Sequence, residues 1–102
     1  MNAAVAHHKA ELERFCRQFH VRRLELFGSA ASDRYSPAQS DLDFLVEFTP
    51  LPRGRYADTY FGLHEALERL FGRPVDLIVA SAIKNPYFRQ SVEETKVLLY
   101  AA

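Results

Sequence analysis

Residues 41–48, DLDFLVEF, constrain the fold more than any other stretch, because polar and apolar side chains alternate along them. A period of two is that of a β-strand, in which successive side chains point to opposite faces. One face would carry Leu42, Phe44, Val46 and Phe48, and the other Asp41, Asp43, Leu45 and Glu47. The sequence therefore predicts a strand with one apolar face and with two carboxylates near its beginning.

Two more strands and two long helices are predicted around this segment. Residues 21–27 (VRRLELF) and 74–79 (PVDLIV) are short and rich in apolar and β-branched residues, which is typical of strands. Apolar residues recur at helical spacing over 4–19 and over 56–71. Gly72 is expected to end the second helix as a C-terminal cap.

Smaller signals complete the order of elements. Ser29 lies where an N-cap would, before a short helix of small residues. Asn85 and Pro86 are typical of a helix start, and the tail 96–100 is either a last strand or the end of that helix. Strands interleaved with helices predict an α/β (α+β) domain with one sheet. Strand direction cannot be read from the sequence, and the connection at 28–40, which lacks a long helix, allows antiparallel or mixed pairing; the fold we expect is a mixed central sheet flanked by helices.

The composition fits one folded domain. Hydrophobic residues make up 48% of the 102 residues, which is enough for a core. We expect a single domain over 1–102, with its core at about 10–100. The formal net charge is +0, so no global field favours nucleic acid or a membrane surface, and direct nucleic-acid binding is not expected.

The cellular compartment is predicted from the cysteine count and from the apolar runs. Cys16 is the single cysteine, so no intrachain disulfide can form. The beginning of the sequence lacks the apolar core of a signal peptide, and no apolar run approaches the length of a membrane span. We expect a cytoplasmic protein that does not contact a membrane.

Three aspartates are the candidate chemical groups. Asp41 and Asp43 would lie about 6.6 Å apart on one face of a strand, and Asp76 opens another strand in the same manner. If these strands are neighbours, the three carboxylates converge, repel one another and acquire raised pKa values. A divalent cation removes that repulsion, and hard oxygen ligands favour Mg²⁺ or Mn²⁺ over zinc. Such an ion usually shares its coordination with substrate phosphates.

Gly28 and Ser29 form a candidate phosphate site. A glycine lets the backbone approach a ligand, a following helix start offers N–H groups to an anion, and the Ser29 hydroxyl can donate as well. A lone Gly-Ser is usually a turn, and a lone Asp-x-Asp is usually a strand end or a cap. Together, each at the end or start of a strand, they predict phosphoryl or nucleotidyl transfer.

In these motifs the sequence resembles the minimal nucleotidyltransferases of the DNA polymerase beta superfamily. The resemblance is carried by 24–32 (LELFGSAAS), 40–48 (SDLDFLVEF), 74–79 and the ending 92–100, and it covers roughly 10–100. Proteins of this type are commonly antitoxins paired with a HEPN-domain RNase toxin. The family activity is transfer of AMP from ATP to a tyrosine of that toxin, which silences the RNase.

The resemblance also implies a role for each candidate residue. Gly28 and Ser29 would hold the nucleotide phosphates. Asp41 and Asp43 would bind Mg²⁺, and Asp76 would be a third metal ligand or the base for the incoming hydroxyl. A carboxylate base would help because a tyrosine hydroxyl, with a pKa near 10, is a poor nucleophile at neutral pH.

One departure from the family pattern keeps other functions open. Relatives often carry arginines just after Gly-Ser, whereas this chain has Ala30, Ala31 and Ser32, so Arg34 is the candidate to take their place at the nucleotide. A second hypothesis is therefore a protein that neutralises a toxin by covering it, with weak or no catalysis. A third is a nucleotidyltransferase for a small molecule or a nucleic acid, which the neutral charge and the single domain disfavour.

Overall fold

A computed structural model describes residues 3–31 and 41–102 of the chain. Their elements, in order, are α1 (Ala3–His7), α2 (Lys9–Gln18), β1 (Val21–Phe27), η1 (Gly28–Ala31), β2 (Leu42–Phe48), α3 (Tyr56–Phe71), β3 (Val75–Val79), η2 (Ala80–Ala82), α4 (Pro86–Thr95) and β4 (Val97–Ala101). η1 and η2 are short 3₁₀ helices. None of the described helices is long and apolar enough to cross a membrane.

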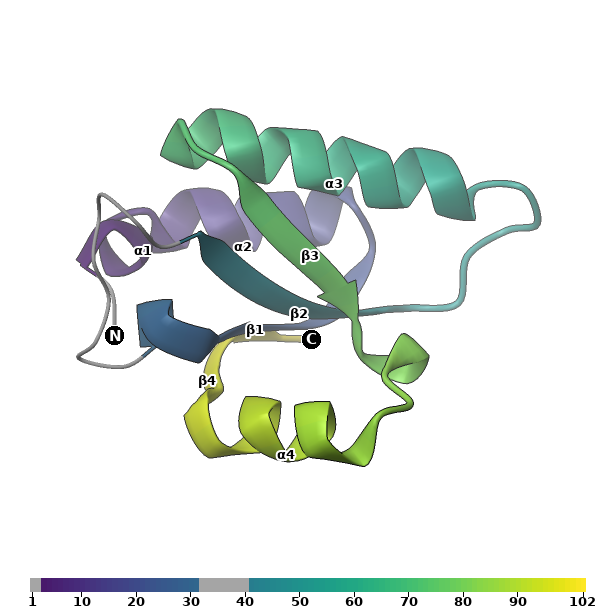
Figure 1. Cartoon of the computed structure of the whole chain (residues 1–102). Coiled ribbons are helices and arrows are strands. Elements are labelled where there is room, and N and C mark those ends of the chain that lie inside the picture. The colour runs from purple at the N-terminus through teal and green to yellow at the C-terminus, as the bar shows by residue number, and fades with distance from the viewer. Residues whose placement is uncertain (1–2, 32–40) are drawn as a thin grey trace.

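The four described strands form one mixed sheet in the order β3-β2-β1-β4 (Figure 1). β1 lies antiparallel to both β2 and β4, and β2 lies parallel to β3. A parallel neighbour needs a long crossover connection, and α3 supplies it. The predicted α/β (α+β) fold class with a mixed sheet is thus confirmed.

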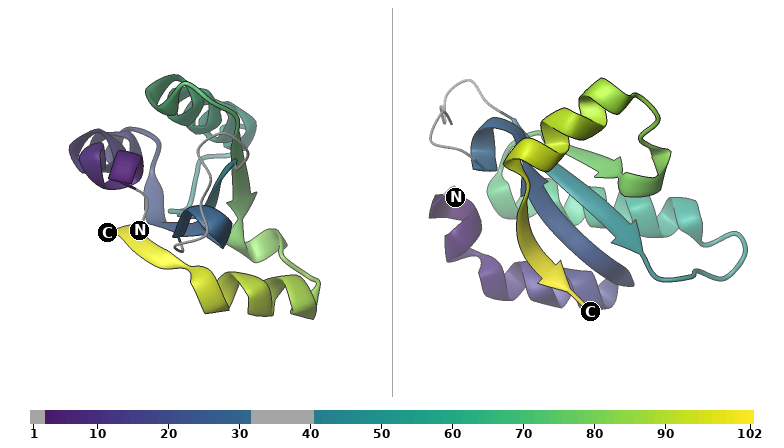
Figure 2. Two further views of the ribbon diagram at one scale, coloured as in Figure 1. Left: turned by 60° about the vertical axis from the view of Figure 1, so that its left-hand side comes forward. Right: turned by 90° about the horizontal axis from the view of Figure 1, so that it is seen from below.

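Helices cover both faces of this sheet (Figure 2). α1, α2 and α3 lie over one face, and α4 lies over the other. The alternation of β2 follows from this arrangement, because Phe44 and Val46 join the core beneath α2 and α3 while Leu45 packs in a smaller cluster with Val92 of α4. Both faces of β2 are therefore covered, and of the acids on its α4 side Asp43 is partly buried.

The predicted helix over 4–19 is interrupted, so that prediction was partly wrong. A turn at His8 separates α1 from α2, although the sequence has neither proline nor glycine there. The His8 ring packs edge-on against Phe71 at 5.6 Å between centroids, and its Nδ1 lies 3.2 Å from Glu11 Oε2. One of these contacts is local and the other is tertiary, and neither has a signature in the spacing of apolar residues.

The other predicted ends agree with the structure. Gly72 has a φ of 63° and its N–H bonds to the carbonyl of Glu68, as expected of a C-terminal cap. Asn85 caps α4, and Pro86 is the first residue of that helix. Of the two alternatives for the tail, the structure has the strand, β4, paired with β1.

Replacing Asn85 with alanine should lower the free energy of unfolding by about 1 kcal/mol. Its side-chain oxygen accepts from the backbone N–H groups of Tyr87 (2.9 Å) and Phe88 (3.3 Å), which the first turn of α4 otherwise leaves without helical partners. Urea unfolding would measure the loss. Gln90→Ala, which removes an exposed side chain bonded to Glu94, is the control and should cost clearly less. Equal losses would contradict a specific cap.

Candidate active site

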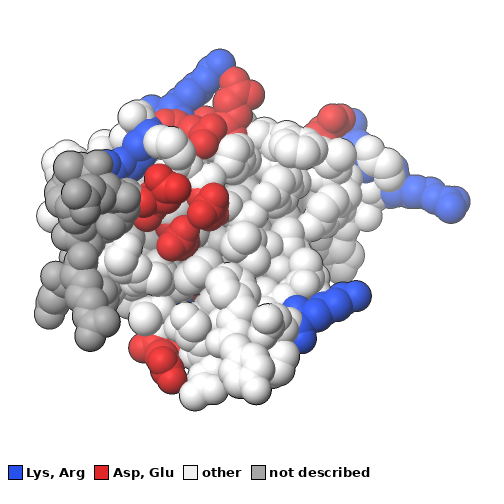
Figure 3. All heavy atoms as spheres, viewed as in Figure 1, with Lys and Arg blue, Asp and Glu red and all other residues white. Residues whose placement is uncertain are grey.

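Asp43 and Asp76 lie side by side at one end of the sheet. Each is the second residue of its strand, and they are Cα partners in the parallel pairing of β2 with β3. Neighbouring strands are about 4.8 Å apart, so the two carboxyl groups face each other on the α4 side of the sheet. Figure 3 shows acidic side chains gathered on this side of the molecule.

The environment of Asp43 disfavours its charged form. Burial, a hydrogen bond with the Asp76 carboxyl, and the negative charges of Asp76 and Asp41 together raise the pKa of Asp43 to about 6. Burial is the largest of these causes. The Asp43 carboxyl therefore gives up its proton at a higher pH than an ordinary aspartate.

Asp41 lies beside the pair rather than within it. It precedes β2, is exposed, and acts on Asp43 through its charge. Within residues 3–31 and 41–102, no group of three His, Cys, Asp or Glu residues lies close enough together to hold a metal ion. The structure therefore brings two of the three predicted acids into contact and leaves the third next to them.

This donor set fits a hard divalent cation. The paired oxygens of Asp43 and Asp76 are the ligands that Mg²⁺ prefers, and the charge of the ion would offset the repulsion between the two carboxylates. Mg²⁺ commonly takes only one or two carboxylates from the protein and completes its shell with water and phosphate oxygens. Two carboxylates in contact, with a third nearby, are thus sufficient.

Gly28, which follows β1, lies against the Asp43 carboxylate. The last residue of that strand, Phe27, is the Cα partner of Asp43, and Gly28 follows with a φ of 73°. A Cβ atom at position 28 would lie 2.6 Å from Asp43 Oδ2. A side chain at position 28 is therefore unfavourable for two reasons: the left-handed backbone strains it, and the Asp43 carboxylate would have to move.

The residues after Gly28 differ in part from expectation. The short helix of small residues is present, but η1 begins at Gly28, so Ser29 lies inside it rather than at an N-cap. Ala30 is fully buried in the core beneath α2 and α3. Ser32 and Arg34, the latter a predicted nucleotide-binding residue, lie outside the described residues.

Thr95, at the end of α4, belongs to the same site although the sequence did not single it out. Its Oγ1 accepts a hydrogen bond of 2.9 Å from the N–H of Gly28, across 67 residues of sequence. A threonine just before a predicted strand has no distinctive spacing, so only the likeness of the ending 92–100 to relatives drew attention to this region.

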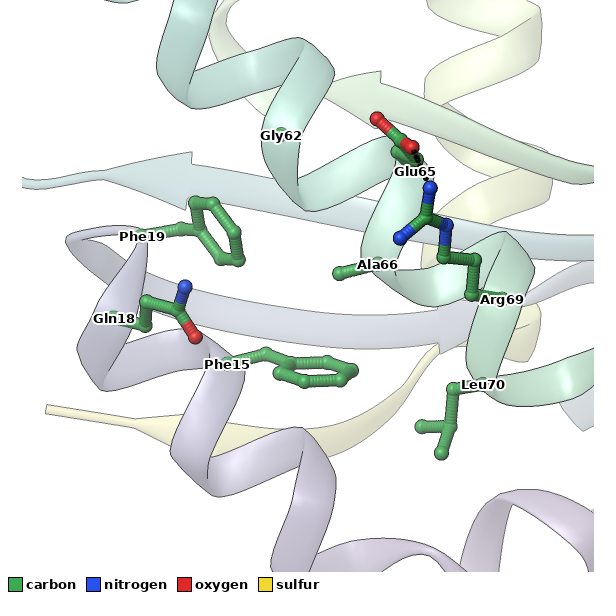
Figure 4. A pocket seen from close by; sticks show the side chains of 8 residues that line it. All are labelled: Phe15, Gln18, Phe19, Gly62, Glu65, Ala66, Arg69 and Leu70. Carbon is green, nitrogen blue, oxygen red and sulfur yellow. Dashed lines mark ion pairs between the residues drawn. The ribbon is translucent and has the colours of Figure 1, made fainter.

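Two hollows of the surface lie elsewhere. A groove of about 550 Å³ lies between α2 and α3. Phe15, Phe19 and Leu70 line it, together with the Glu65–Arg69 ion pair (2.6 Å) (Figure 4). A polar hollow of about 310 Å³ lies between the sheet and α4. Neither is lined by Asp41, Asp43 or Asp76, so volume alone would not have located the acids.

Comparison with known proteins points to the same chemistry. The nucleotidyltransferase domain family matches residues 9–99 of the chain. A protein of Methanocaldococcus jannaschii, named as a candidate protein adenylyltransferase, is 40% identical over 77 residues, which are 76% of this chain and 74% of the relative.

Solved structures share the fold. The structure of a candidate minimal nucleotidyltransferase aligns with a TM-score of 0.74 and 28% identity over 95% of each chain. A complex from Shewanella oneidensis, of a tri-AMPylated HEPN toxin with its MNT antitoxin, aligns with a TM-score of 0.64 and 16% identity over 95% of this chain and 72% of the other. From the match over 9–99, together with the archaeal relative, the chain belongs to the nucleotidyltransferase domain family.

Proposed function

We propose that the chain is an antitoxin that transfers AMP from ATP to a tyrosine of a cognate HEPN-domain RNase toxin in the cytoplasm, and thereby neutralises it. The observation that carries this proposal is the Asp43–Asp76 pair with Gly28 packed against it. The adenylyltransferase name of the archaeal relative and the AMPylated toxin in the Shewanella complex support the choice of substrate.

Each predicted residue has a part in the proposed reaction. Asp41, Asp43 and Asp76 would hold Mg²⁺, which when bound neutralises charge on the phosphates. Gly28 and Ser29 would lie against the nucleotide phosphates, and Arg34 would add a positive charge there. Because the Gly28 N–H is already bonded to Thr95, Gly28 contributes close approach rather than a hydrogen bond.

The proposed transfer forms one bond and breaks another. The tyrosine oxygen attacks the α-phosphorus of ATP, the bond from that phosphorus to the β-phosphate bridging oxygen breaks, and pyrophosphate leaves. The hydroxyl proton passes to a carboxylate, and Asp76 is the more accessible of the paired acids. The remaining contribution of the protein is positioning and electrostatics.

A second candidate function is neutralisation of the toxin by covering alone. The aromatic side chains at the start of α4 favour it, because Tyr87 is 82% exposed and Phe88 is 39% exposed. Large exposed aromatic residues are frequent anchors in protein interfaces. The two functions share a partner and differ in whether ATP is needed.

Incubation with ATP, Mg²⁺ and the HEPN-domain protein encoded beside this chain's gene should label a tyrosine of that protein. Label on the α-phosphate should transfer, whereas label on the γ-phosphate should not, and peptide mass spectrometry would locate the AMP. EDTA should stop the transfer, and excess Mg²⁺ or Mn²⁺ should restore it. Full inhibition of the RNase without ATP and without label would favour covering, and transfer of the γ-phosphate would contradict adenylyl transfer.

A further inference from the structure

Thr95 makes hydrogen bonds in two directions at the end of α4. Its Oγ1 accepts from the Gly28 N–H at 2.9 Å, and the same hydroxyl lies within reach of two carbonyls of its own helix, Ser91 O at 3.3 Å and Val92 O at 3.4 Å. A hydroxyl can donate to a carbonyl while it accepts from an amide. A valine side chain has the same shape and can do neither.

The next residue holds the same junction between α4 and β4. Lys96 Nζ lies 3.7 Å from Glu25 Oε2, and the Glu25 side chain, buried in β1, also pairs with Arg23 at 3.3 Å. The Lys96 N–H bonds to the Val92 carbonyl at 2.9 Å and ends the helix. Two successive side chains thus hold this junction, Lys96 to Glu25 of β1 and Thr95 to Gly28 just after it.

Gly28 lies between Thr95 and the acids. Its N–H is bonded to Thr95, while its Cα lies so near Asp43 that a Cβ would come within 2.6 Å of the carboxylate. An amide that is already bonded is not available to a phosphate, so the Thr95 hydroxyl serves to hold the backbone. Displacement of Gly28 would move the turn that begins η1 or would crowd the Asp43 carboxylate.

We propose that Thr95 is a positioning residue for AMP transfer, which fixes Gly28 against Asp43 through the hydrogen bond from the Gly28 amide. This inference rests on the proposed adenylyl transfer. Thr95 touches neither the nucleotide nor the acceptor, and its effect passes through the place of Gly28. Misplacement of a group in an active site by a fraction of an ångström to 1 Å changes rates strongly.

The test compares three variants of the full chain with Mg²⁺, ATP and the HEPN-domain protein. Thr95→Val should lower kcat about tenfold and leave the KM for the HEPN-domain protein unchanged, whereas Thr95→Ser should keep most of the activity. Thr59→Val is the matched control, because the Thr59 hydroxyl also bonds to a helix carbonyl, that of Arg55 at 2.7 Å, in α3. It should transfer AMP at the wild-type rate.

A readout independent of activity is the Gly28 amide in ¹H–¹⁵N spectra. Thr95→Val should shift its resonance and speed its hydrogen exchange, and the other two variants should not. A Gly28 amide or a kcat that Thr95→Val leaves unchanged would overturn the proposal, as would an equal loss in Thr59→Val. Thermal unfolding would show whether Thr95→Val is folded. If it is not, Thr95→Ala, which also removes the hydroxyl, takes its place with the same two readouts and the same contradicting outcomes.

If the chain does not transfer AMP, the proposed function is contradicted, but the positioning role of Thr95 can still be tested. The affinity for Mg²⁺–ATP, measured by calorimetry, then takes the place of kcat. A several-fold weaker affinity in Thr95→Val together with a changed Gly28 amide would support positioning, whereas equal affinities would overturn it.

Discussion

Asp43→Asn should reduce AMP transfer by about 10³-fold or more, because the substitution keeps the shape of the side chain and removes the charge that holds a cation. Asp43 is the partly buried member of the pair and the one that touches Gly28. Its loss would therefore remove a ligand for Mg²⁺ and disturb the turn after β1. Rates of transfer with α-labelled ATP would measure the effect.

The same variant should be more stable than the wild type near neutral pH when no metal is added. The folded-state pKa of Asp43 is raised from 3.8 to about 6, so the folded protein binds this proton more tightly than the unfolded chain. The stabilisation is complete below about pH 4 and is lost as the pH rises through about 6. The asparagine variant does not lose stability in this way. We therefore expect its free energy of unfolding to exceed that of the wild type by about 1 kcal/mol at about pH 7.5, after solvent screening is allowed for.

Urea unfolding of both proteins at about pH 4 and about pH 7.5 would test the sign. Mg²⁺ should stabilise the wild type near neutral pH and leave Asp43→Asn unchanged. Asp58→Asn, at an exposed acid in the first turn of α3, is the control. It should transfer AMP and should not show the gain in stability expected of Asp43→Asn near neutral pH. A wild type more stable than Asp43→Asn at about pH 7.5 without metal would contradict the raised pKa.

The pairing of Asp43 with Asp76 could be anticipated only in part, because short-range patterns place each acid on its strand but do not pair the strands. The alternation in 41–48 fixes the face of Asp43, and each acid stands near the beginning of an apolar segment. Once β2 and β3 run parallel and in register, the two acids must be neighbours. Neither the direction of the strands nor which strands pair could be predicted, since both depend on contacts between segments distant in sequence.

Contacts between distant residues left no pattern in the sequence. Thr95 and Gly28 are brought together only when α4 packs on the face opposite α2 and α3. Glu25 is another example, because a glutamate in a strand is usually exposed, yet here it is 4% exposed and paired with Arg23 and Lys96. The contact of His8 with Phe71, at the break between α1 and α2, is a third example.

Gly28→Ala should lower the free energy of unfolding by about 3 kcal/mol and AMP transfer by about 10²-fold. A φ of 73° costs an alanine about 1–2 kcal/mol on its own. The remaining loss comes from the Asp43 carboxylate, which must move because the new Cβ would lie 2.6 Å from its Oδ2. Urea unfolding and the transfer assay would measure the two effects separately.

Gly54→Ala separates the two causes. Gly54 has a φ of 82°, so alanine is strained there as well, but nothing lies within 4 Å of the added Cβ. This variant should therefore lose about 1–2 kcal/mol and keep its activity. Equal losses of stability in both variants would show that only the backbone conformation requires glycine at position 28. A loss of transfer confined to Gly28→Ala would show that the chain needs glycine there to make room for the Asp43 carboxylate.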